Sequence, residues 1–305
     1  MYYPFMRGKK HELSALRKIS SILDPQKVRP IIEPVKSNTT SLIRTITLLN
    51  SHQHRPLVII NPIEGELAQS NLLSLLQNPD ISFLPCVAFT HNNVTTATQI
   101  ANQFIQDHVE FSTYFRHEPT ANLGHITSQA LINSVFSTSN STHTFLSTLP
   151  NLVKIQDCFT ASARNADYSI LPYNFSDAHL TYQNLPNAIG FGDFQIVGEP
   201  FSSSGGPARA VAIHITYINS QANDLMYIKH SVSTIDSNTT TNTGAKCIEA
   251  LQSLVSFANQ TPDINQQTIG FTELLDYHTR RHFPNLGPIK ECSMMHHIET
   301  LNSYL

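Results

Sequence analysis

The stretch LVIINPIEGELAQSNLLSLLQNPDISFLPCVAF (residues 57–89) contains one complete example of the pattern that decides the fold. It opens with the continuous apolar run 57–60 and closes with a second apolar run, 83–89. Between them, residues 67–76 carry leucines at helical spacing. Apolar runs without polar alternation are typical of parallel strands that are buried on both faces. The stretch therefore predicts a strand, a helix and a second, parallel strand.

The same unit recurs on both sides of this stretch. Further strands are predicted at 2–6, 29–35 and 111–115, and further helices at 12–23, 41–50 and 94–105. The first 120 residues thus hold five strand-plus-helix units at a spacing of roughly 26 residues, which favours a closed parallel barrel over an open sheet. No glycine-rich turn follows the first strand, which argues against a dinucleotide-binding domain. The residues expected to be buried in this half are Ile31, Ile32, Val58 and Ile59.

The pattern loosens after residue 120. Strands are predicted at 142–146, 152–157 and 189–197, and helices at 245–257 and in most of 273–305. Residues 209–219 alternate between apolar and polar, so they are expected to form an antiparallel hairpin with residues 225–232. His214 should face away from Val211, Ile213 and Ile215, because side chains alternate across a strand.

We therefore predict an α/β fold: a TIM-barrel-like parallel barrel, irregular in its second half, with a β-hairpin and C-terminal helices. It is expected to form a single domain over residues 1–305, with regular units in 1–120, an irregular half in 121–305 and the hairpin at 209–232.

The composition bounds the classes of function. Charged residues make up 13% of the chain, about half of the usual share, and the net charge is −3 at pH 7. This balance gives no sign of broad binding to nucleic acid or to a membrane surface. The four cysteines form no CxxC pair, and residues 1–10 lack the apolar run of a signal peptide. We expect a cytoplasmic protein from a reducing compartment.

Polar side chains follow the predicted strands, at the edge where a parallel barrel carries its chemistry. The candidate catalytic residues are Glu33, His117, Asp157, Asp193 and His214, and the candidate ligand-binding residues are Arg7, Asn61 and Arg164. Three carboxylates at one mouth, balanced by Mg²⁺ or Mn²⁺, would suit metal-assisted hydrolysis. In the alternative interpretation, arginines balance the carboxylates in an ion-pair network without catalysis.

Arg164 lies in an irregular polar loop, where its forked guanidinium could bind a phosphate or a carboxylate. The alternative is an internal ion pair with Asp157 or Asp167. Near the C-terminus, His296 and Glu299 share a helix face, but the HExxH pattern and a third metal ligand are missing.

Several segments recur together, in the same order, in one known family. They are MYYPFMRGKKHELSAL (1–16), DCFTASARNADYS (157–169), GFGDFQIVG (190–198), ARAVAIHITYIN (208–219), YIKHSVS (227–233) and FPNLGPIKECSMMHHIE (283–299). The chain resembles the bacterial Beta family proteins, named after a phage beta protein, and within them an uncharacterised branch named after a myxobacterial locus tag. The resemblance covers essentially the whole chain. It implies a barrel-like α/β fold, a cytoplasmic bacterial protein and a role in defence against phage, and it carries no catalytic residues.

Two classes of function stay open. The first is a metal-assisted hydrolase that acts on a phosphate-containing substrate. The second is a non-catalytic binding or sensing module, with a degenerate barrel that contacts a partner protein from a defence operon. Side chains that converge on one pocket would favour the enzyme, and scattered side chains would favour the module.

Overall fold

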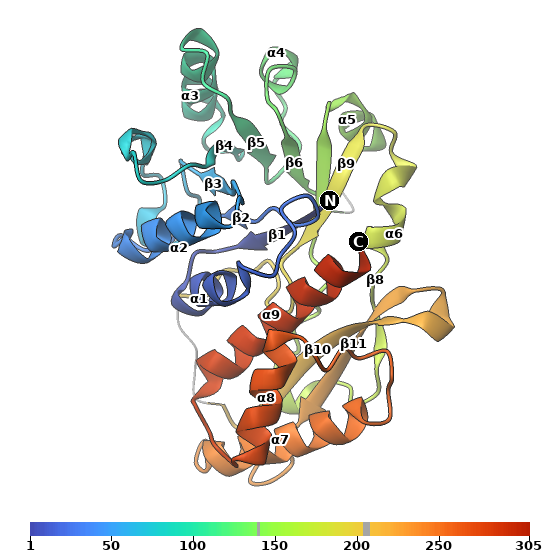
Figure 1. Ribbon diagram of the computed structural model, residues 1–305. Helices are drawn as coiled ribbons and strands as arrows, with labels where there is room; N and C mark the ends of the chain where they lie inside the picture. Colours follow the sequence, from blue (N-terminus) through green and yellow to red (C-terminus); the bar gives the residue numbers. More distant parts are fainter. Residues whose placement is uncertain (139–140, 204–207) are drawn as a thin grey trace. The chain divides into compact units, whose positions relative to one another are not determined.

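The computed structural model describes residues 1–138, 141–203 and 208–305 (Figure 1). The chain divides into two compact units. Unit 1 comprises Met1–Leu13, Ser20–Asp157 and Ala178–Phe194, and unit 2 comprises Ser14–Ile19, Cys158–Asp177 and Gln195–Leu305. That the two units together form the single domain expected over 1–305 stays a prediction.

Unit 1 is built on a closed barrel of parallel strands. In barrel order the strands are β1 (Tyr2–Met6), β2 (Ile31–Ile32), β3 (Leu57–Ile59), β4 (Leu84–Phe89), β5 (Ser112–Phe115), β6 (Asn133–Phe136), β7 (Leu152–Gln156) and β9 (Ala188–Asp193). The ring closes through β9, which pairs with both β7 and β1. The predicted TIM-barrel-like α/β fold is confirmed, and so is the parallel pairing of the first five strands.

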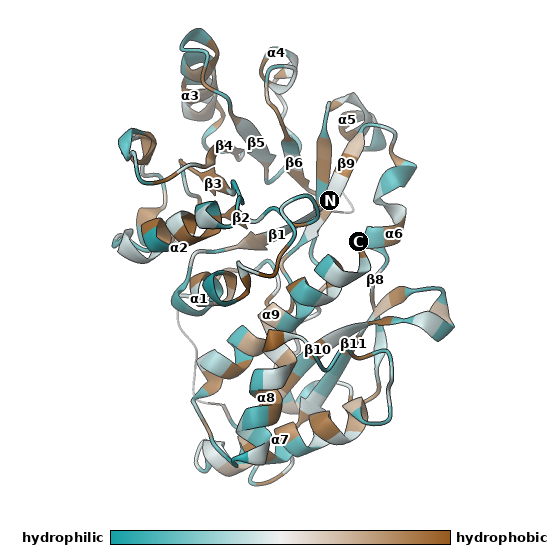
Figure 2. Cartoon of the chain, viewed as in Figure 1, coloured by the Kyte–Doolittle hydropathy of each residue, from teal (hydrophilic) through white to brown (hydrophobic). Residues whose placement is uncertain are grey.

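Short helices connect these strands. They are α1 (Lys10–Ile19, whose second half belongs to unit 2), α2 (Thr40–Ser51), α3 (Val94–Gln106), α4 (Gly124–Thr127), α5 (His143–Thr148) and α6 (Ala178–Thr181), with the 3-10 helices η1 (Gly65–Leu67), η2 (Leu73–Gln77) and η4 (Tyr182–Asn184). Helix α2 is amphipathic, with hydrophobic and hydrophilic residues around its axis (Figure 2). Its buried face holds Leu42, Ile46 and Leu49 at i, i+4 and i+7.

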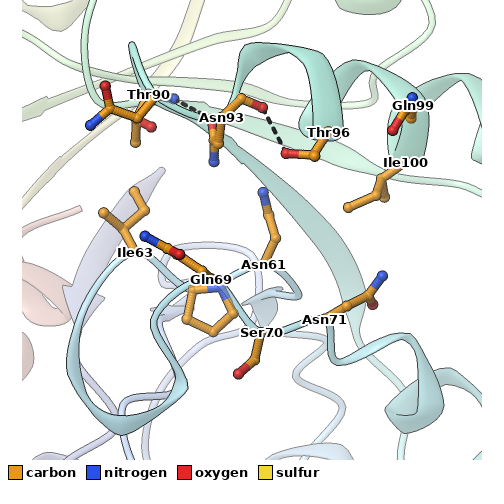
Figure 3. A pocket seen from close by; sticks show the side chains of 12 residues that line it. Asn61, Ile63, Gln69, Ser70, Asn71, Thr90, Asn93, Thr96, Gln99 and Ile100 are labelled. Carbon is orange, nitrogen blue, oxygen red and sulfur yellow. Dashed lines mark hydrogen bonds between the residues drawn. The ribbon is translucent and has the colours of Figure 1, made fainter.

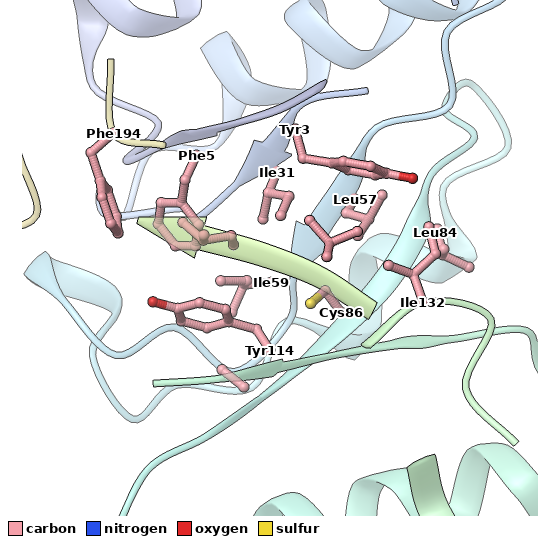
Figure 4. Close-up of a cluster of buried hydrophobic side chains, with 13 residues drawn as sticks. Tyr3, Phe5, Ile31, Leu57, Ile59, Leu84, Cys86, Tyr114, Ile132 and Phe194 are labelled. Atoms are coloured by element: carbon pink, nitrogen blue, oxygen red, sulfur yellow. The ribbon is translucent and has the colours of Figure 1, made fainter. Parts of the chain in front are cut away.

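The barrel interior is a hydrophobic core (Figure 4). Every second residue of a strand faces inward, as with Tyr3 and Phe5 of β1. The Phe5 ring lies 4.9 Å from the ring of Tyr114 and 5.0 Å from that of Phe194, measured between centroids. All four residues expected to be buried, Ile31, Ile32, Val58 and Ile59, are fully buried. Just beyond the C-terminal ends of the strands, further side chains point to the same inward side as the core. We call the region that these side chains form the barrel mouth.

Two of the predicted elements are wrong. Residues 67–76 do not form an α-helix, because only the 3-10 helices η1 and η2 occur between β3 and β4. Residues 142–146 are not a strand: the Thr142 hydroxyl accepts a hydrogen bond from the N–H of Phe145, 3.1 Å away, and so caps α5. Strand β6 was not predicted.

Unit 2 contains a separate antiparallel sheet and several helices. Strand β10 (Ala212–Asn219) pairs with β11 (Leu225–Val232), which also pairs with β8 (Tyr173–Ser176). The other elements are η3 (Asn165–Asp167), η5 (Ser220–Ala222), α7 (Thr243–Ala258), α8 (Ile269–Thr279) and α9 (Leu286–Tyr304). The predicted hairpin is confirmed. In the described ranges, no helix is long and apolar enough to cross a membrane.

Candidate functional site

Glu33 lies directly beyond β2, on the inward side of the barrel. It is two residues after Ile31, which faces the core, so its side chain points into the mouth. Arg7 lies in the same way beyond β1, two residues after Phe5. The two side chains form an ion pair and are almost completely buried. The structure therefore places both residues at the mouth, in contact with each other.

Both oxygens of Glu33 are occupied. Oε2 accepts from Arg7, and Oε1 accepts from the backbone N–H groups of Ile63 and Glu64, at 2.8 and 3.1 Å. The Glu64 side chain forms a second ion pair, in which it accepts a hydrogen bond from Arg116 at 2.6 Å. These contacts join residues that follow β1, β2, β3 and β5 into one ion-pair network.

Aromatic rings hold the Arg7 guanidinium. Its Cζ lies 5.2 Å from the ring centroid of Phe5 and 5.3 Å from that of Phe194. Cations at such distances are attracted by the ring face, and the attraction increases where water is excluded. Arg7 is therefore held by a carboxylate and two rings. This arrangement matches the alternative interpretation of the mouth, an ion-pair network without catalysis.

The other two carboxylates do not join Glu33. Asp193 pairs in register with Pro4, on the outward parity of β9, and its Oδ1 accepts from the Tyr2 hydroxyl at 2.6 Å. Asp193 therefore faces away from the core, and the prediction that it lies at the mouth is wrong. That prediction rests only on its position at a strand end. Side chains alternate between the two faces of a strand, and Asp193 is on the outer face. Asp157 is exposed beyond β7. Within the described part of the chain, no group of three His, Cys, Asp or Glu side chains could hold a metal ion.

The remaining candidates have other partners than Glu33. His117 is exposed and its ring stacks on that of His91, with centroids 4.5 Å apart. Arg164 is exposed and forms a two-pronged ion pair with Asp167, at 2.9 and 2.7 Å, so the internal ion pair is the correct interpretation. His214 belongs to the antiparallel sheet of unit 2 and not to a barrel strand.

His214 faces a second histidine across the hairpin. It is paired in register with His230, and the two Nδ1 atoms lie 2.6 Å apart. The Nε2 of His230 is 2.8 Å from the Tyr173 hydroxyl. Burial lowers the pKa of both histidines; for His230, burial together with the nearby Lys229 lowers the pKa to about 4. One Nδ1 must accept the hydrogen that the other donates, so the pair cannot be doubly protonated without breaking this contact.

The C-terminal histidine motif is used within unit 2. His296 Nδ1 is 2.7 Å from the Thr268 hydroxyl, and its Nε2 is 2.9 Å from the carbonyl oxygen of Thr216. Glu299 accepts from the N–H groups of Ile269 and Gly270, at 2.6 and 3.0 Å, and so caps α8. These groups have structural partners in place of a metal ion.

A cavity of about 630 Å³ opens beside the mouth, beyond β3 and β4 (Figure 3). One bank is the segment after β3, with Gln69, Ser70 and Asn71, and the other runs from Thr90 into α3. A size of roughly 300–1,000 Å³ is usual for small-molecule sites.

Asn61 is the sequence candidate that the structure places in this cavity. Its amide also extends the β3–β4 ladder: Nδ2 donates to the carbonyl of Ala88, and Oδ1 accepts from the N–H of Ala88, both at 2.8 Å. The other amides of the lining are not among the predicted site residues. The signal was present, because Asn and Gln are dense just after both strands, in NPIEGELAQSN (61–71) and THNN (90–93).

No family model, no curated protein and no solved structure matches this chain. The resemblance to the Beta family therefore stays a prediction.

Proposed function

We propose that the chain is a non-catalytic binding module that takes its ligand at the C-terminal ends of the barrel strands. The observation that carries this proposal is the engagement of Glu33. Its carboxylate accepts from Arg7 and from two backbone N–H groups, three of the roughly four hydrogen bonds that a carboxylate can accept, and these contacts compete with proton abstraction and with metal coordination. The cavity beside it supplies the binding space.

A hydrolytic site would need a different arrangement. A general base must reach the proton that it removes, and a magnesium site needs several converging oxygen ligands. Glu33 lies in the ion-pair network, Asp193 faces outward and Asp157 is exposed. The binding alternative therefore has more support than the metal-assisted hydrolase. In the defence role implied by the resemblance, such a module would sense a ligand and signal to a partner protein.

The test compares hydrolysis and thermal stability. The probe is bis(p-nitrophenyl) phosphate with Mg²⁺ or Mn²⁺, and the variant is Glu33→Gln. We expect no metal-dependent release of nitrophenol from either protein, and no rise in the wild-type melting temperature with metal. Glu33→Gln should nevertheless lower the melting temperature, because Arg7 loses its counter-ion.

Glu66→Gln is the matched control, since Glu66 is an exposed carboxylate paired with Lys36. It should leave the melting temperature almost unchanged. Hydrolysis by the wild type that disappears in Glu33→Gln and persists in Glu66→Gln would overturn the binding proposal and support the hydrolase.

A further inference from the structure

The cavity beside the mouth is lined without charge. None of its lining residues is Asp, Glu, Lys, Arg or His, and none is aromatic. Half of them carry side-chain amides: Asn61, Gln69, Asn71, Asn92, Asn93 and Gln99. The rest are hydroxyl-bearing or aliphatic, such as Thr96 and Ile100. An amide offers both donors and an acceptor, so this wall matches a ligand that does the same.

Some of these amides build the wall. Asn93 accepts from the N–H of Thr90 at 2.7 Å and donates to the carbonyl of Ala88 at 2.9 Å. Asn61 holds the same residue of β4 from the other bank. These hydrogen bonds fix both banks of the cavity to the end of β4, so the space between the banks is formed before any ligand arrives.

Other amides have hydrogen-bonding groups to spare. Gln69, Asn92 and Gln99 are exposed, and their side chains make no hydrogen bond within the described ranges, although the backbone N–H of Gln69 donates to the carbonyl of Pro62 at 3.0 Å. Asn71 uses its oxygen to accept from the N–H of Leu73, which leaves its NH₂ group. In Figure 3, Gln69 and Asn71 lie on one bank and Gln99 lies on the other.

Gln69 adopts a backbone conformation that favours glycine. Its φ is 65°, in the left-handed region that L-residues with a side chain rarely enter. Glycine would adopt this conformation at lower energy, so a glutamine there destabilises the loop slightly. The Gln69 side chain lines the cavity, so replacing it by glycine removes its amide from the wall without straining the backbone.

The same composition favours some ligand classes over others. Phosphates and carboxylates are bound by cationic groups, and ammonium groups by carboxylates or aromatic rings. Nucleobases are usually stacked on aromatic side chains. The lining of this cavity has no charged and no aromatic side chain, and the start of α3, where Asn93 and Thr96 lie, is its one feature that favours an anion. A neutral molecule with many hydroxyls fits, because each hydroxyl can donate to an amide oxygen and accept from an amide NH₂.

We infer that this cavity binds a neutral saccharide of one or two sugar rings. Amides on the two banks would hydrogen-bond the hydroxyls, and Ile63 and Ile100 would contact the apolar faces of the rings. The inference rests on the proposal that the chain is a binding module, and it adds the ligand class.

The full chain is titrated with methyl glucoside, maltose, cellobiose and N,N′-diacetylchitobiose. Calorimetry and ligand-observed NMR measure the binding. We expect at least one of them to bind. Gln99→Ala and Gln69→Gly should each weaken binding by about tenfold, the usual effect of losing a good hydrogen bond. Gln69→Gly should also keep or raise the melting temperature, since it relieves the backbone.

Gln106→Ala is the matched control, because Gln106 is exposed on the same helix and lies outside the cavity. It should leave the affinity unchanged. Glucose 6-phosphate, adenosine and triglycine amide serve as comparison ligands. Failure of all four saccharides to bind, or binding that survives both cavity variants, overturns the saccharide assignment. Binding of a comparison ligand alone also overturns it and leaves the binding module standing. Cleavage of a bound saccharide overturns the binding module and keeps the cavity as the site.

Discussion

At the scale of single residues, the Arg7–Glu33 pair decides how the barrel mouth behaves. The pair is almost completely buried, so removing one partner leaves a desolvated charge. We expect Glu33→Gln to lower the free energy of unfolding by about 3–5 kcal/mol. Arg7→Met combined with Glu33→Gln should cost less, because neither charge remains and Gln still accepts from the two N–H groups. Urea denaturation measures both values.

The exposed pair Lys36–Glu66 gives the comparison for this prediction. Its side chains are about half exposed, and Glu66→Gln should cost no more than about 1 kcal/mol. If the double variant Arg7→Met with Glu33→Gln is as unstable as Glu33→Gln alone, the unpaired buried charge of Arg7 is not the cause of the lost stability.

At the scale of elements, the hairpin should be sensitive to acid. Burial lowers the pKa of His214 and His230, that of His230 to about 4, while unfolded histidine titrates near 6.5. Above about pH 6.5, both states bind no proton there and the hairpin's contribution is complete. Between about 6.5 and 4, the unfolded chain binds protons that the folded chain does not, so stability falls as the pH falls.

The expected loss is about 1.4 kcal/mol per pH unit for each such histidine within this window. Urea denaturation at about pH 7 and about pH 5 measures it, and His214→Leu should reduce the difference. Burial also lowers the pKa of His296 to about 4, so His296 still contributes to the acid dependence in the His214→Leu variant. His143 is exposed, so His143→Leu should leave the difference unchanged. An acid dependence of His214→Leu equal to that of the wild type would contradict the assignment to the hairpin.

The elements also show what the sequence could predict. The early strands were found because most of their residues are apolar, as in 57–60 and 83–89. Strand β6 was missed because it carries buried polar residues: Asn133 donates to the carbonyls of Thr127 and Pro150 and accepts from the Thr113 hydroxyl. Such a strand is stabilised by partners 6 to 20 residues away in the sequence, and the apolar pattern contains no trace of them.

The candidate site also has a part that the sequence could predict and a part that it could not. Arg7 and Glu33 could be placed at the mouth because each directly follows an apolar strand. The cavity could not be predicted, because it requires residues 67–76 to avoid the helix that their leucines suggest. Leu72 and Leu75 are buried, but Gln69 adopts a positive φ that no right-handed helix contains. Tertiary packing thus overrides the local spacing.

At the scale of the whole molecule, closure of the barrel depends on close contact at β9. A Cβ at Gly192 would lie 2.3 Å from the carbonyl oxygen of Tyr3 and 3.2 Å from Cγ1 of Ile155. We expect Gly192→Ala to lower the free energy of unfolding by about 3 kcal/mol, since both neighbouring strands must shift. Thermal and urea denaturation check this.

Gly244 provides the opposite case. It lies in α7, and a Cβ there would be 3.7 Å from the nearest atom, in Phe283. Gly244→Ala should therefore stabilise the chain by about 0.5–1 kcal/mol. Equal effects of the two substitutions would show that crowding at β9 does not limit closure.

The position of β9 in the chain has a consequence during synthesis. Strand β1 leaves the ribosome first, but its partner β9 follows much later: Tyr2 and Asp193, which bond across this seam, are 191 residues apart. At roughly 5–20 residues per second, one edge of β1 waits about 10–40 seconds for its partner. The excursion that carries β8 to another sheet lengthens this delay, since it is made before β9. The nascent barrel therefore stays an open sheet with an unpaired edge for most of its translation, which is the interval in which chaperones would protect it from neighbouring chains.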